Sequence, residues 1–439
     1  MKKNKIIGIW GLGKTGKSII SFLHSQGYEN LIAHAEAITP EQSQSLKAQK
    51  IQFFQDQKDF LDHADSIVPS PGIKINRYPQ YKNKFVTELD LFCQFFKKPI
   101  IAVTGSIGKT TVTHILSQLL QHKLRLATGG NIGTPMLDMV GKSSDYALLE
   151  LSSFQLELAH KIRPHIGILT NFYPNHLDWH ESVETYFAAK MNMFKRMGPD
   201  QHAIIPIEKQ HEFENCKAAL HVFSDKEIPP SKMQPNTSYY FLHNNCLIRN
   251  RNGVIDTLAF YYNDLSYQIN WIVISICLHI LQVKLQKKEL QAISLFEHRL
   301  ENVCTLKDIT IYNDSKSTVP QATLAAVGKL QHKPIHLLLG GIGKNINRAP
   351  LIADLKNKVS TIYCFGKEAQ QLHALCKKYQ IPSFYFATLD EAFKACFGKA
   401  KPHEQILFSP AGASFDLFEN YEKRGEYFKK LVHQVCIPS

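Results

Sequence analysis

Residues 99–111 read PIIAVTGSIGKTT, and this stretch decides the fold of the chain. The apolar residues 100–103 predict a buried strand, and a loop that ends in Gly-Lys-Thr follows and opens a helix. Such a loop binds phosphate, because its backbone N–H groups cradle the anion while Lys109 reaches the terminal phosphates and Thr110 binds Mg²⁺. The spacing departs from the common phosphate-loop pattern, since Val103 stands where the first glycine is expected. The stretch predicts an α/β domain that binds phosphate groups.

A second glycine-rich loop, GLGKTG at 11–16, follows the apolar residues 6–10. The pattern G-x-G-x-x-G after a strand is typical of dinucleotide binding, and Glu36 lies twenty residues beyond the last glycine. The glycines let the backbone approach a diphosphate, which could belong to NAD, FAD or a nucleotide sugar. A tight turn without a ligand is the alternative. A helix from residue 17 and a strand at 31–35 complete a βαβ unit with a parallel sheet.

The alternation of strands and helices continues along the chain. Strands are expected at 147–151 and 166–170, whereas no regular pattern is evident between 201 and 266. A further group begins near Glu297, and the spacing of its strands again favours a parallel, doubly wound sheet. Its strands are expected at 310–312, 335–339, 361–365 and 405–408. At roughly 150 residues per domain, a chain of 439 residues is expected to form three domains.

The composition is that of an ordinary globular protein. Hydrophobic residues make up 44% and charged residues 20% of the chain, which argues against a disordered, collagen-like or coiled-coil protein. The 51 basic and 38 acidic residues give a net charge of +13, which suggests anionic partners. Because the basic residues are spread along the chain, we interpret most of this charge as solvated surface and expect no nucleic-acid partner.

The cysteines and the apolar runs bear on the compartment. The nine cysteines are odd in number and form no CxxC pair, which favours a reduced cytosolic protein over a disulfide framework. The most apolar window, 269–283, contains polar residues such as Asn270 and is shorter than the ~20 residues that a membrane span needs. It predicts a buried helix instead. We therefore expect a soluble, cytoplasmic protein without membrane insertion.

Polar residues downstream of the phosphate loop could complete a catalytic site. Glu150 ends an expected strand, where its carboxylate can hold Mg²⁺ beside the loop. A cluster whose spacing invites a zinc site follows at Asn171, His176, Asp178 and His180. Neither an HExxH motif nor a neighbouring cysteine accompanies this cluster, so a zinc site is disfavoured.

These motifs belong to an ordered set that resembles the Mur ligase family over nearly the whole chain. The set comprises GLGKTG at 11–16, SPG at 70–72, TGSIGKTTV at 104–112, GGNIG at 129–133, ELSSFQLE at 150–157, NHLDWH at 175–180, AAK at 188–190, EHRLE at 297–301, NDSKST at 313–318, GG at 340–341 and SPAGASFD at 409–416. The run ELSSFQL is the most specific, because it resembles the branch of the family that adds D-glutamate, whereas the sister ligases differ here.

The resemblance implies an α/β fold of three domains and an amide-bond-forming reaction. The domains would be a UDP-binding Rossmann-like domain at 1–94, a central ATP-binding domain of the P-loop type at 95–296 and a C-terminal amino-acid-binding Rossmann-like domain at 297–439. ATP would phosphorylate the carboxylate of UDP-N-acetylmuramoyl-L-alanine, and the amine of D-glutamate would then displace phosphate, in peptidoglycan precursor synthesis. One or two Mg²⁺ ions are implied, the other partners would be these small molecules, and we expect a monomer.

The resemblance also implies roles for single residues. ATP would be bound by Gly105, Ser106, Ile107, Gly108, Lys109, Thr110, Thr111, Arg299 and Asp314. Metal ions would be held by Thr110, Glu150, His176 and a carbamylated Lys190, and catalysis would depend on Lys109, Glu150, His176 and Lys190. The UDP substrate would contact Thr15, Gly72, Asn131 and His176. D-Glutamate, whose two carboxylates suit cationic partners, would contact Lys316, Thr318, Lys344, Ser414 and Tyr421.

Several positions depart from the family's pattern. They are Ile107 in the phosphate loop, Asn175 before His176, Ser317 and Val319 around Thr318, and Tyr421 in place of phenylalanine. Asn270 is the candidate for a nucleotide-contacting asparagine in a poorly matched segment. Glu36 could replace the acidic residue that is expected near His34 or Ala35.

Three other interpretations stay open. The chain could be another ATP-dependent amide ligase, such as a sister Mur ligase or a polyglutamate-adding enzyme. It could be a nicotinamide dehydrogenase built on residues 11–16, which leaves the Lys109 loop unexplained. It could also be a nucleotide-gated binding protein, although intact Glu150, His176 and Lys190 speak against the absence of ligase chemistry.

Overall fold

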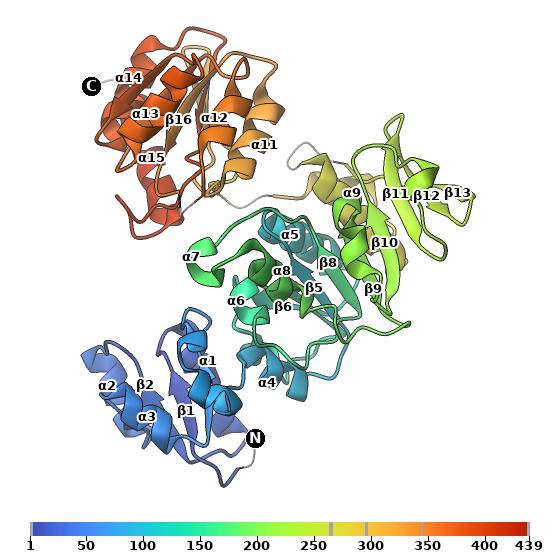
Figure 1. Ribbon diagram of the computed structural model, residues 1–439, viewed down its shortest axis with the longest axis vertical. Helices are drawn as coiled ribbons and strands as arrows, with labels where there is room; N and C mark the ends of the chain where they lie inside the picture. Colours follow the sequence, from blue (N-terminus) through green and yellow to red (C-terminus); the bar gives the residue numbers. More distant parts are fainter. Residues whose placement is uncertain (1–2, 263–266, 295–296, 344–345, 437–439) are drawn as a thin grey trace. The chain divides into compact units, whose positions relative to one another are not determined.

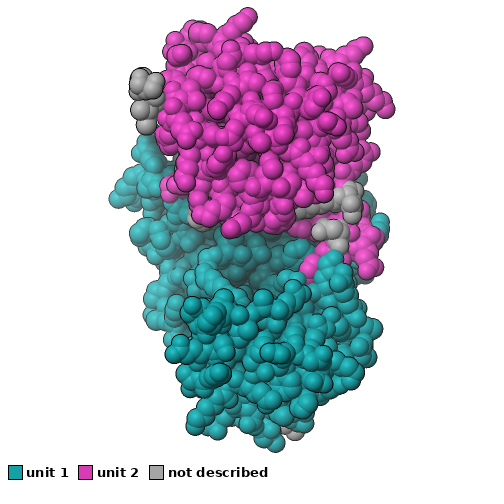
Figure 2. Space-filling view, turned by 90° about the vertical axis from the view of Figure 1, so that its left-hand side faces the viewer, with its two compact units in different colours: residues 1–172, 184–293 teal, residues 173–183, 294–439 magenta. Residues whose placement is uncertain are grey.

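The computed structural model describes residues 3–262, 267–294, 297–343 and 346–436 (Figure 1). They form two compact units, which Figure 2 colours separately. The first unit contains Met1–Phe172 and Glu184–Ile293, and the second contains Tyr173–Val183 and Ser294–Ser439. Both are built on sheets rich in parallel strands, as predicted. In the part of the chain that is described, no helix combines the length and the apolar character that a bilayer crossing requires.

The first sheet of the first unit carries the glycine-rich loop of residues 11–16. Its neighbouring strands all run parallel, in the order β3-β2-β1-β4. The strands are β1 (Ile7–Trp10), β2 (Leu31–His34), β3 (Gln52–Phe53) and β4 (Ser66–Pro69), and the helices are α1 (Lys14–Ser25), α2 (Pro40–Ala48) and α3 (Gln57–His63). The expected strands at 6–10 and 31–35 are confirmed, and the first helix begins three residues earlier than predicted, within the loop itself.

The second sheet carries the phosphate loop and runs in the order β13-β12-β11-β10-β9-β8-β5-β7-β6. Its strands are β5 (Ile100–Thr104), β6 (Leu126–Gly130), β7 (Tyr146–Glu150), β8 (Ile166–Leu169), β9 (His202–Pro206), β10 (Ala219–Phe223), β11 (Ser238–His243), β12 (Cys246–Arg251) and β13 (Val254–Leu258). The helices of this region are α4 (Glu88–Phe95), α5 (Lys109–Leu120), α6 (Ser153–Leu156), α8 (Val183–Met191), α9 (Gln268–Ile280) and α10 (Lys287–Gln291). Strands β5, β7 and β8 are nearly continuous apolar runs, as parallel strands buried on both faces require.

The region 201–266, in which the sequence showed no regular pattern, contains strands β9 to β13. Strands β9, β10 and β11 extend the parallel sheet, and β12 and β13 add antiparallel hairpins to its edge. The apolar window 269–283 is confirmed as a buried helix, because α9 is covered from Asn270 to Leu278.

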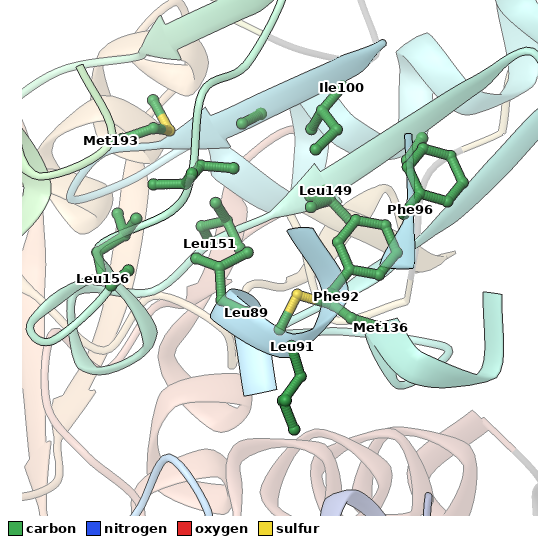
Figure 3. Packing of buried hydrophobic residues seen from close by; sticks show 14 of the residues in the cluster. Leu89, Leu91, Phe92, Phe96, Ile100, Met136, Leu149, Leu151, Leu156 and Met193 are labelled. Atoms are coloured by element: carbon green, nitrogen blue, oxygen red, sulfur yellow. The ribbon is translucent and has the colours of Figure 1, made fainter. Parts of the chain in front are cut away.

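One hydrophobic core runs through both sheets of the first unit. Buried residues of β1 and α1 belong to the same cluster as those of β5 and β7. Helix α4 contributes Leu89, Leu91 and Phe92 to this cluster, and Figure 3 shows Leu89 and Phe92 among residues of the second sheet's layer. Those neighbours are Phe96, Ile100, Met136, Leu149, Leu151, Leu156 and Met193. The two sheets of this unit therefore share a folding core.

The second unit contains a sheet in the order β14-β15-β19-β16-β17-β18, in which only the β14–β15 pair of the described strands is antiparallel. Its strands are β14 (Glu301–Leu306), β15 (Ile309–Asn313), β16 (Ile335–Gly340), β17 (Thr361–Phe365), β18 (Ser383–Phe386) and β19 (Gln405–Phe408). Its helices are α7 (Leu177–His180), α11 (Pro320–Leu330), α12 (Ala349–Leu355), α13 (Ala369–Lys378), α14 (Leu389–Lys399) and α15 (Tyr421–Cys436). The four strands expected here are confirmed, whereas β14 and β18 escaped prediction.

The cysteines whose side chains are described are free thiols. Cys277, Cys364, Cys376 and Cys396 are buried, and Cys246 at the turn between β11 and β12 is exposed. The buried thiols fill apolar positions of the cores, as small hydrophobic residues do.

Candidate functional site

The phosphate loop joins β5 to α5 in a strained conformation. Gly105 has φ +145°, and a Cβ there would lie 2.0 Å from Thr170 Oγ1, so only glycine fits. The side chain of Asn171 binds the backbone of the loop. Its Oδ1 accepts from the Ile107 N–H and its Nδ2 donates to Ile107 O, both at 3.0 Å. The isoleucine side chain at 107, which departs from the Mur ligase pattern, therefore leaves these anchors in place. Sequence reasoning had assigned Asn171 no role in the loop.

Helix α9 brings Asn270 to the same loop. Gly108 has φ +81°, and a Cβ at this position would lie 2.8 Å from Asn270 Oδ1. Asn270 is buried at the first turn of its helix. The amide that the sequence singled out as a nucleotide contact thus lies beside the phosphate loop, although it is distant in sequence.

Two lysine amines converge on one carbonyl of the loop. Lys109 Nζ and Lys190 Nζ each donate to Gly105 O at 2.9 Å. Lys190 is only 1% exposed, and its amine lies 4.6 Å from the centroid of the Tyr186 ring. Burial lowers the pKa of Lys190 well below its ordinary value, and the charge of Lys109 lowers it further, against the opposing effect of Glu150. The net effect shifts the equilibrium of this amine toward its uncharged, nucleophilic form.

Glu150 ends β7 with a carboxylate that is 1% exposed. Its Oε1 accepts from Asn131 Nδ2 at 2.8 Å, whereas its buried Oε2 has no hydrogen-bond donor among the residues that the structure describes. An orphaned buried carboxylate oxygen beside a phosphate loop fits a hard cation such as Mg²⁺, and the buried Thr110 hydroxyl is a second suitable ligand.

A metal ion at this position would need other ligands as well. Among the described residues, no group of three or more His, Cys, Asp or Glu side chains lies together as a metal site. Magnesium commonly keeps several waters and takes further oxygens from substrate phosphates. The protein therefore needs to supply only a few ligands, and one carboxylate and one hydroxyl suffice.

The glycine-rich loop after β1 lies beside the turn after β4, because these strands pair in parallel with Trp10 opposite Pro69. Gly11 has φ +95°, and a Cβ there would lie 2.6 Å from Ser70 Oγ. A Cβ on Gly16 would lie 1.9 Å from Gly11 O, so the turn requires glycine at both positions. The loop therefore has the close backbone approach that a diphosphate site needs.

Thr15 lies in the first turn of α1, and Gly72 is exposed in the turn after β4, so both predicted substrate contacts lie at the carboxyl edge of this sheet. His34 is buried, and its Nδ1 lies 3.0 Å from Phe54 O. Glu36 is exposed just beyond β2. Of the positions considered for the missing acidic residue, Glu36 is the one that can meet a ligand at this edge.

Helix α1 also contacts the loop that carries Asn131. Lys14 Nζ donates to Gly133 O and Ser18 Oγ donates to Asp138 Oδ1, each at 2.5 Å. The glycine-rich loop and the loop after β6 are thereby held together inside the first unit.

His176 lies in the segment Tyr173–Val183, which groups with the second compact unit. It has φ +55° and caps α7, and its N–H donates to Asn175 Oδ1 at 2.9 Å. Asn175 therefore supplies the side-chain oxygen that aspartate would supply at this position. The metal and substrate roles of His176 stay predictions.

In the second unit, the carboxyl ends of β15, β19 and β16 are neighbours. Asp314 follows β15 and is 5% exposed. Its carboxylate accepts from Ser317 Oγ at 2.5 Å, Ser409 Oγ at 2.7 Å and the Leu300 N–H at 3.1 Å. Burial raises the pKa of Asp314 to about 6, although these hydrogen bonds oppose the shift. Asp314 thus ties three segments together, and its contact with ATP stays a prediction.

The residues predicted to bind the amino acid follow the same strands. Lys316 Nζ lies 3.5 Å from the centroid of the Tyr421 ring, which is a cation–π contact. Thr318 is half-buried two residues beyond Lys316, and Ser414 is buried in the loop after β19. The structure brings their loops to one sheet edge, whereas Lys344 lies outside the described residues.

Two buried guanidinium groups organise these loops. No local sequence pattern points to them, because arginine is usually exposed. Arg424 donates to the carbonyls of Ser315 at 2.8 Å and Gly412 at 3.0 Å. Arg348 donates to Pro410 O at 2.8 Å and pairs with Glu368 at 3.2 Å. Burial lowers the pKa of Arg424 to about 10, which still leaves its guanidinium charged at neutral pH.

Family models match three segments of the chain. Residues 5–83 match the "Mur ligase MurD-like, N-terminal domain", residues 103–243 the "Mur ligase middle domain" and residues 298–412 the "Mur ligase, glutamate ligase domain". The three segments occur in the order that the motifs at 11–16, 104–112 and 313–318 predict.

Curated relatives extend over the full chain. The UDP-N-acetylmuramoylalanine–D-glutamate ligase of Koribacter versatilis is 30% identical, with 99% of this chain and 98% of the relative covered. The ligase of the same name from Thermoanaerobacter sp. is 29% identical, with 99% of both chains covered.

Solved structures show the same fold at low identity. The pseudomurein peptide ligase type C of Methanothermus fervidus superposes with a TM-score of 0.60 at 15% identity, covering 98% of this chain and 100% of that one. The MurF ligase of Thermotoga maritima, solved with ADP, has a TM-score of 0.60 at 16% identity, covering 92% and 95%.

Proposed function

The chain belongs to the Mur ligase family, and on this basis we propose that it ligates D-glutamate to UDP-N-acetylmuramoyl-L-alanine at the expense of ATP. The observation that carries the proposal is the set of groups around the phosphate loop: the amines of Lys109 and Lys190 on one loop carbonyl, and the orphaned carboxylate oxygen of Glu150 close to them. In a nicotinamide dehydrogenase, these groups around the phosphate loop would have no chemical role. The full-length relatives support D-glutamate as the acceptor.

The reaction needs two steps. A carboxylate oxygen of the UDP substrate attacks the terminal phosphorus of ATP, ADP departs, and an acyl phosphate forms. The amine nitrogen of D-glutamate then attacks the acyl carbon, the C–O bond to phosphate breaks with its electron pair, and the nitrogen loses a proton. Phosphorylation is required because a free carboxylate is a poor acyl donor.

The residues around the loop suit the first step. Lys109 and the loop N–H groups would balance negative charge on the transferred phosphate. Glu150 and Thr110 would hold Mg²⁺, which supplies further positive charge where the phosphate oxygens gather. Asn171 and Asn270 would keep the loop in the conformation that receives the nucleotide, because both contact its backbone region.

Lys190 would be carbamylated, as the resemblance implies. Carbamylation requires an uncharged amine, which attacks CO₂ and releases a proton, and the buried environment of Lys190 favours that form. The product is an anion at a position where an ammonium group would repel metal ions. This modification gives a physical reason for burying a lysine next to Glu150 and Lys109.

The remaining assignments are part of the same proposal. Thr15, Gly72, Asn131 and His176 would contact the UDP substrate, Arg299 and Asp314 would serve ATP, and Lys316, Thr318, Lys344, Ser414 and Tyr421 would receive D-glutamate. The domain boundaries would lie at 94/95 and 296/297, and the enzyme would act as a monomer in the cytoplasm.

Phosphate release tests the function directly. Purified protein is incubated with ATP, Mg²⁺ and UDP-N-acetylmuramoyl-L-alanine, with and without D-glutamate, and products are identified by mass. Release that requires both substrates, together with the ligated product, is expected. Release with another amino acid or another UDP-muramoyl substrate would move the chain to a sister ligase, and no release under any condition would overturn ligase chemistry.

A further inference from the structure

His298 lies in the turn that precedes β14, next to Arg299, and the sequence motifs assign it no role. Its side chain is 5% exposed. Its backbone has φ +65°, and Leu300 has φ +48°, so Arg299 lies between two residues with a left-handed backbone. Residues other than Gly and Asn rarely adopt this conformation. Such a backbone persists only where its surroundings hold it.

The His298 ring is held by the last residue of β15. Asn313 Nδ2 lies 2.8 Å from His298 Nδ1, and Asn313 itself is fully buried. The Asn313 amide cannot be reversed without loss, because its Oδ1 accepts from the Ser315 N–H at 3.2 Å while its Nδ2 also faces Glu301 Oε2 at 3.2 Å. Nδ2 is therefore the donor, and His298 Nδ1 is the acceptor of an uncharged ring.

Helix α15 leaves space for this ring at a glycine. A Cβ on Gly425 would lie 2.3 Å from His298 Nδ1 and 2.6 Å from its Cγ. Gly425 is buried in the helix interior, where glycine is otherwise unfavourable. Glycine is therefore required at position 425 because any larger residue there would collide with the His298 ring.

The anchored turn connects two segments of the site. The His298 carbonyl accepts from the Lys316 N–H at 3.0 Å, and the Leu300 N–H donates to Asp314 Oδ1 at 3.1 Å. The segments that carry Arg299 and Lys316 are therefore joined by one backbone–backbone bond and one bond from a backbone N–H to the Asp314 carboxylate, and both bonds start from residues of the left-handed turn.

We propose that His298 is a positioning residue, which holds Arg299 and Lys316 in the places that ligation requires. This inference rests on the proposed function, in which Arg299 serves ATP and Lys316 serves D-glutamate. His298 touches neither substrate in this role. It acts through its Asn313 bond and through its own carbonyl.

Two substitutions separate the ring from the backbone. His298→Gly keeps the left-handed turn but removes the acceptor, and His298→Asn keeps both, because asparagine tolerates this backbone and carries an acceptor on its Cγ as histidine does. We expect His298→Gly to raise the KM for ATP and for D-glutamate about tenfold each, with the KM for the UDP substrate unchanged. His298→Asn should restore both values to within threefold of the wild type.

His336→Asn is the matched control. His336 is another buried histidine of the same unit, paired with Glu404 at 2.8 Å near the amino end of β16, away from the loops of the site. Its substitution should lower the thermal unfolding temperature and leave all three KM values unchanged. If His298→Gly also lowers only the unfolding temperature, or if His298→Asn is as impaired as His298→Gly, the positioning role is wrong.

Gly425→Ala displaces the ring from the other side and tests the same idea if His298→Gly does not fold. It should raise the KM values for ATP and D-glutamate when introduced alone. Where His298→Gly does fold, Gly425→Ala should add no further effect in that background, because the methyl group has room there. Unchanged KM values in Gly425→Ala would overturn the inference while the proposed function stands. If the wild-type protein does not ligate, the proposed function is wrong. The two substitutions are then compared by their effects on the unfolding temperature. Additive effects would show that the His298 ring and helix α15 do not depend on one another.

Discussion

Lys190 shows at the scale of one residue how burial changes chemistry. A lysine side chain is ordinarily a hydrated cation, but this one is 1% exposed and lies near a second lysine, so the pKa of its amine is lowered. The nearby Glu150 opposes the shift without abolishing it. The sequence alone offers no sign of this, because Lys190 lies in the unremarkable helical run FAAKM.

We predict that Lys190→Ala abolishes ligation and that small carboxylates partly restore it. The carboxylate would occupy the space that the carbamate leaves and return the negative charge beside the metal. The measurement is the rate of phosphate release with and without added formate or acetate. Rates equal to the wild type in the absence of any carboxylate would show that no carbamate is needed.

We also predict that Asn171→Ala raises the KM for ATP roughly thirtyfold, because two hydrogen bonds of about 1 kcal/mol each no longer hold the Ile107 backbone. Steady-state kinetics with varied ATP checks this. Gln405→Ala is the control, since its buried amide also donates to backbone carbonyls, at Leu330 and Lys333, but in the other unit. An unchanged KM in Asn171→Ala would remove the amide from the site.

At the scale of elements, a row of histidines crosses the strands of the second sheet. His202 Nδ1 lies 3.0 Å from His221 Nε2, His221 Nδ1 lies 2.9 Å from Tyr240 Oη, and the His165 ring lies edge-on to that of His202. Burial, helped by His202, His279, Arg251 and Arg249, lowers the pKa of His221 to about 3. Burial also lowers the pKa of His202 and of His165.

This row predicts loss of stability in mild acid. The unfolded chain takes up a proton at His221 near its ordinary pKa of about 6.5, whereas the folded protein does so only near 3, so the free energy of unfolding falls as the pH drops between these values. From His221 alone the loss at pH 5 is about 2 kcal/mol relative to pH 7.5. Denaturant unfolding at both pH values measures it, and in His221→Asn the difference should shrink. An equal pH dependence in the variant would contradict this role.

The elements also show how far the sequence predicts the fold. The apolar run 100–103 predicted β5, because a strand buried on both faces needs no alternation. Strands β11 to β13 were missed, although the turns at Asn244-Asn245 and Asn252-Gly253 have the positive φ values of tight hairpins and are visible as sequence pairs. Hairpin turns would have been the better signal in that region.

The site was predictable only where one short segment carries the chemistry. The places of Lys109 in the loop and of Glu150 at the end of β7 could be predicted, because a loop and a strand end identify them, whereas their catalytic roles stay predictions. The hydrogen bonds from Asn171 to Ile107 depend on the pairing of β5 with β8. The contacts of Arg424 depend on segments that are distant in sequence. Neither can be predicted from the local sequence. Contacts between distant segments are what the structure adds.

At the scale of the whole molecule, the division into two compact units predicts two thermal transitions. Phe92 is fully buried in the core that both sheets of the first unit share, and Phe393 is 1% exposed in a core of the second unit. Replacing a buried phenylalanine by alanine costs about 3–5 kcal/mol. We expect Phe92→Ala to lower one calorimetric transition and Phe393→Ala the other. A single transition that both variants lower equally would show that the units unfold together.

The exposed thiol at the turn between β11 and β12 has a practical consequence for labelling. Among the cysteines that the structure describes, Cys246 is the exposed one, while burial raises the pKa of Cys93 to about 12 and leaves little of its reactive thiolate. A maleimide fluorophore added in limiting amount should therefore react at Cys246, on the hairpin edge of the second sheet, before it reacts at the other described cysteines. The natural chain thus carries its own attachment point for a dye, so fluorescence experiments on it can begin without an introduced cysteine.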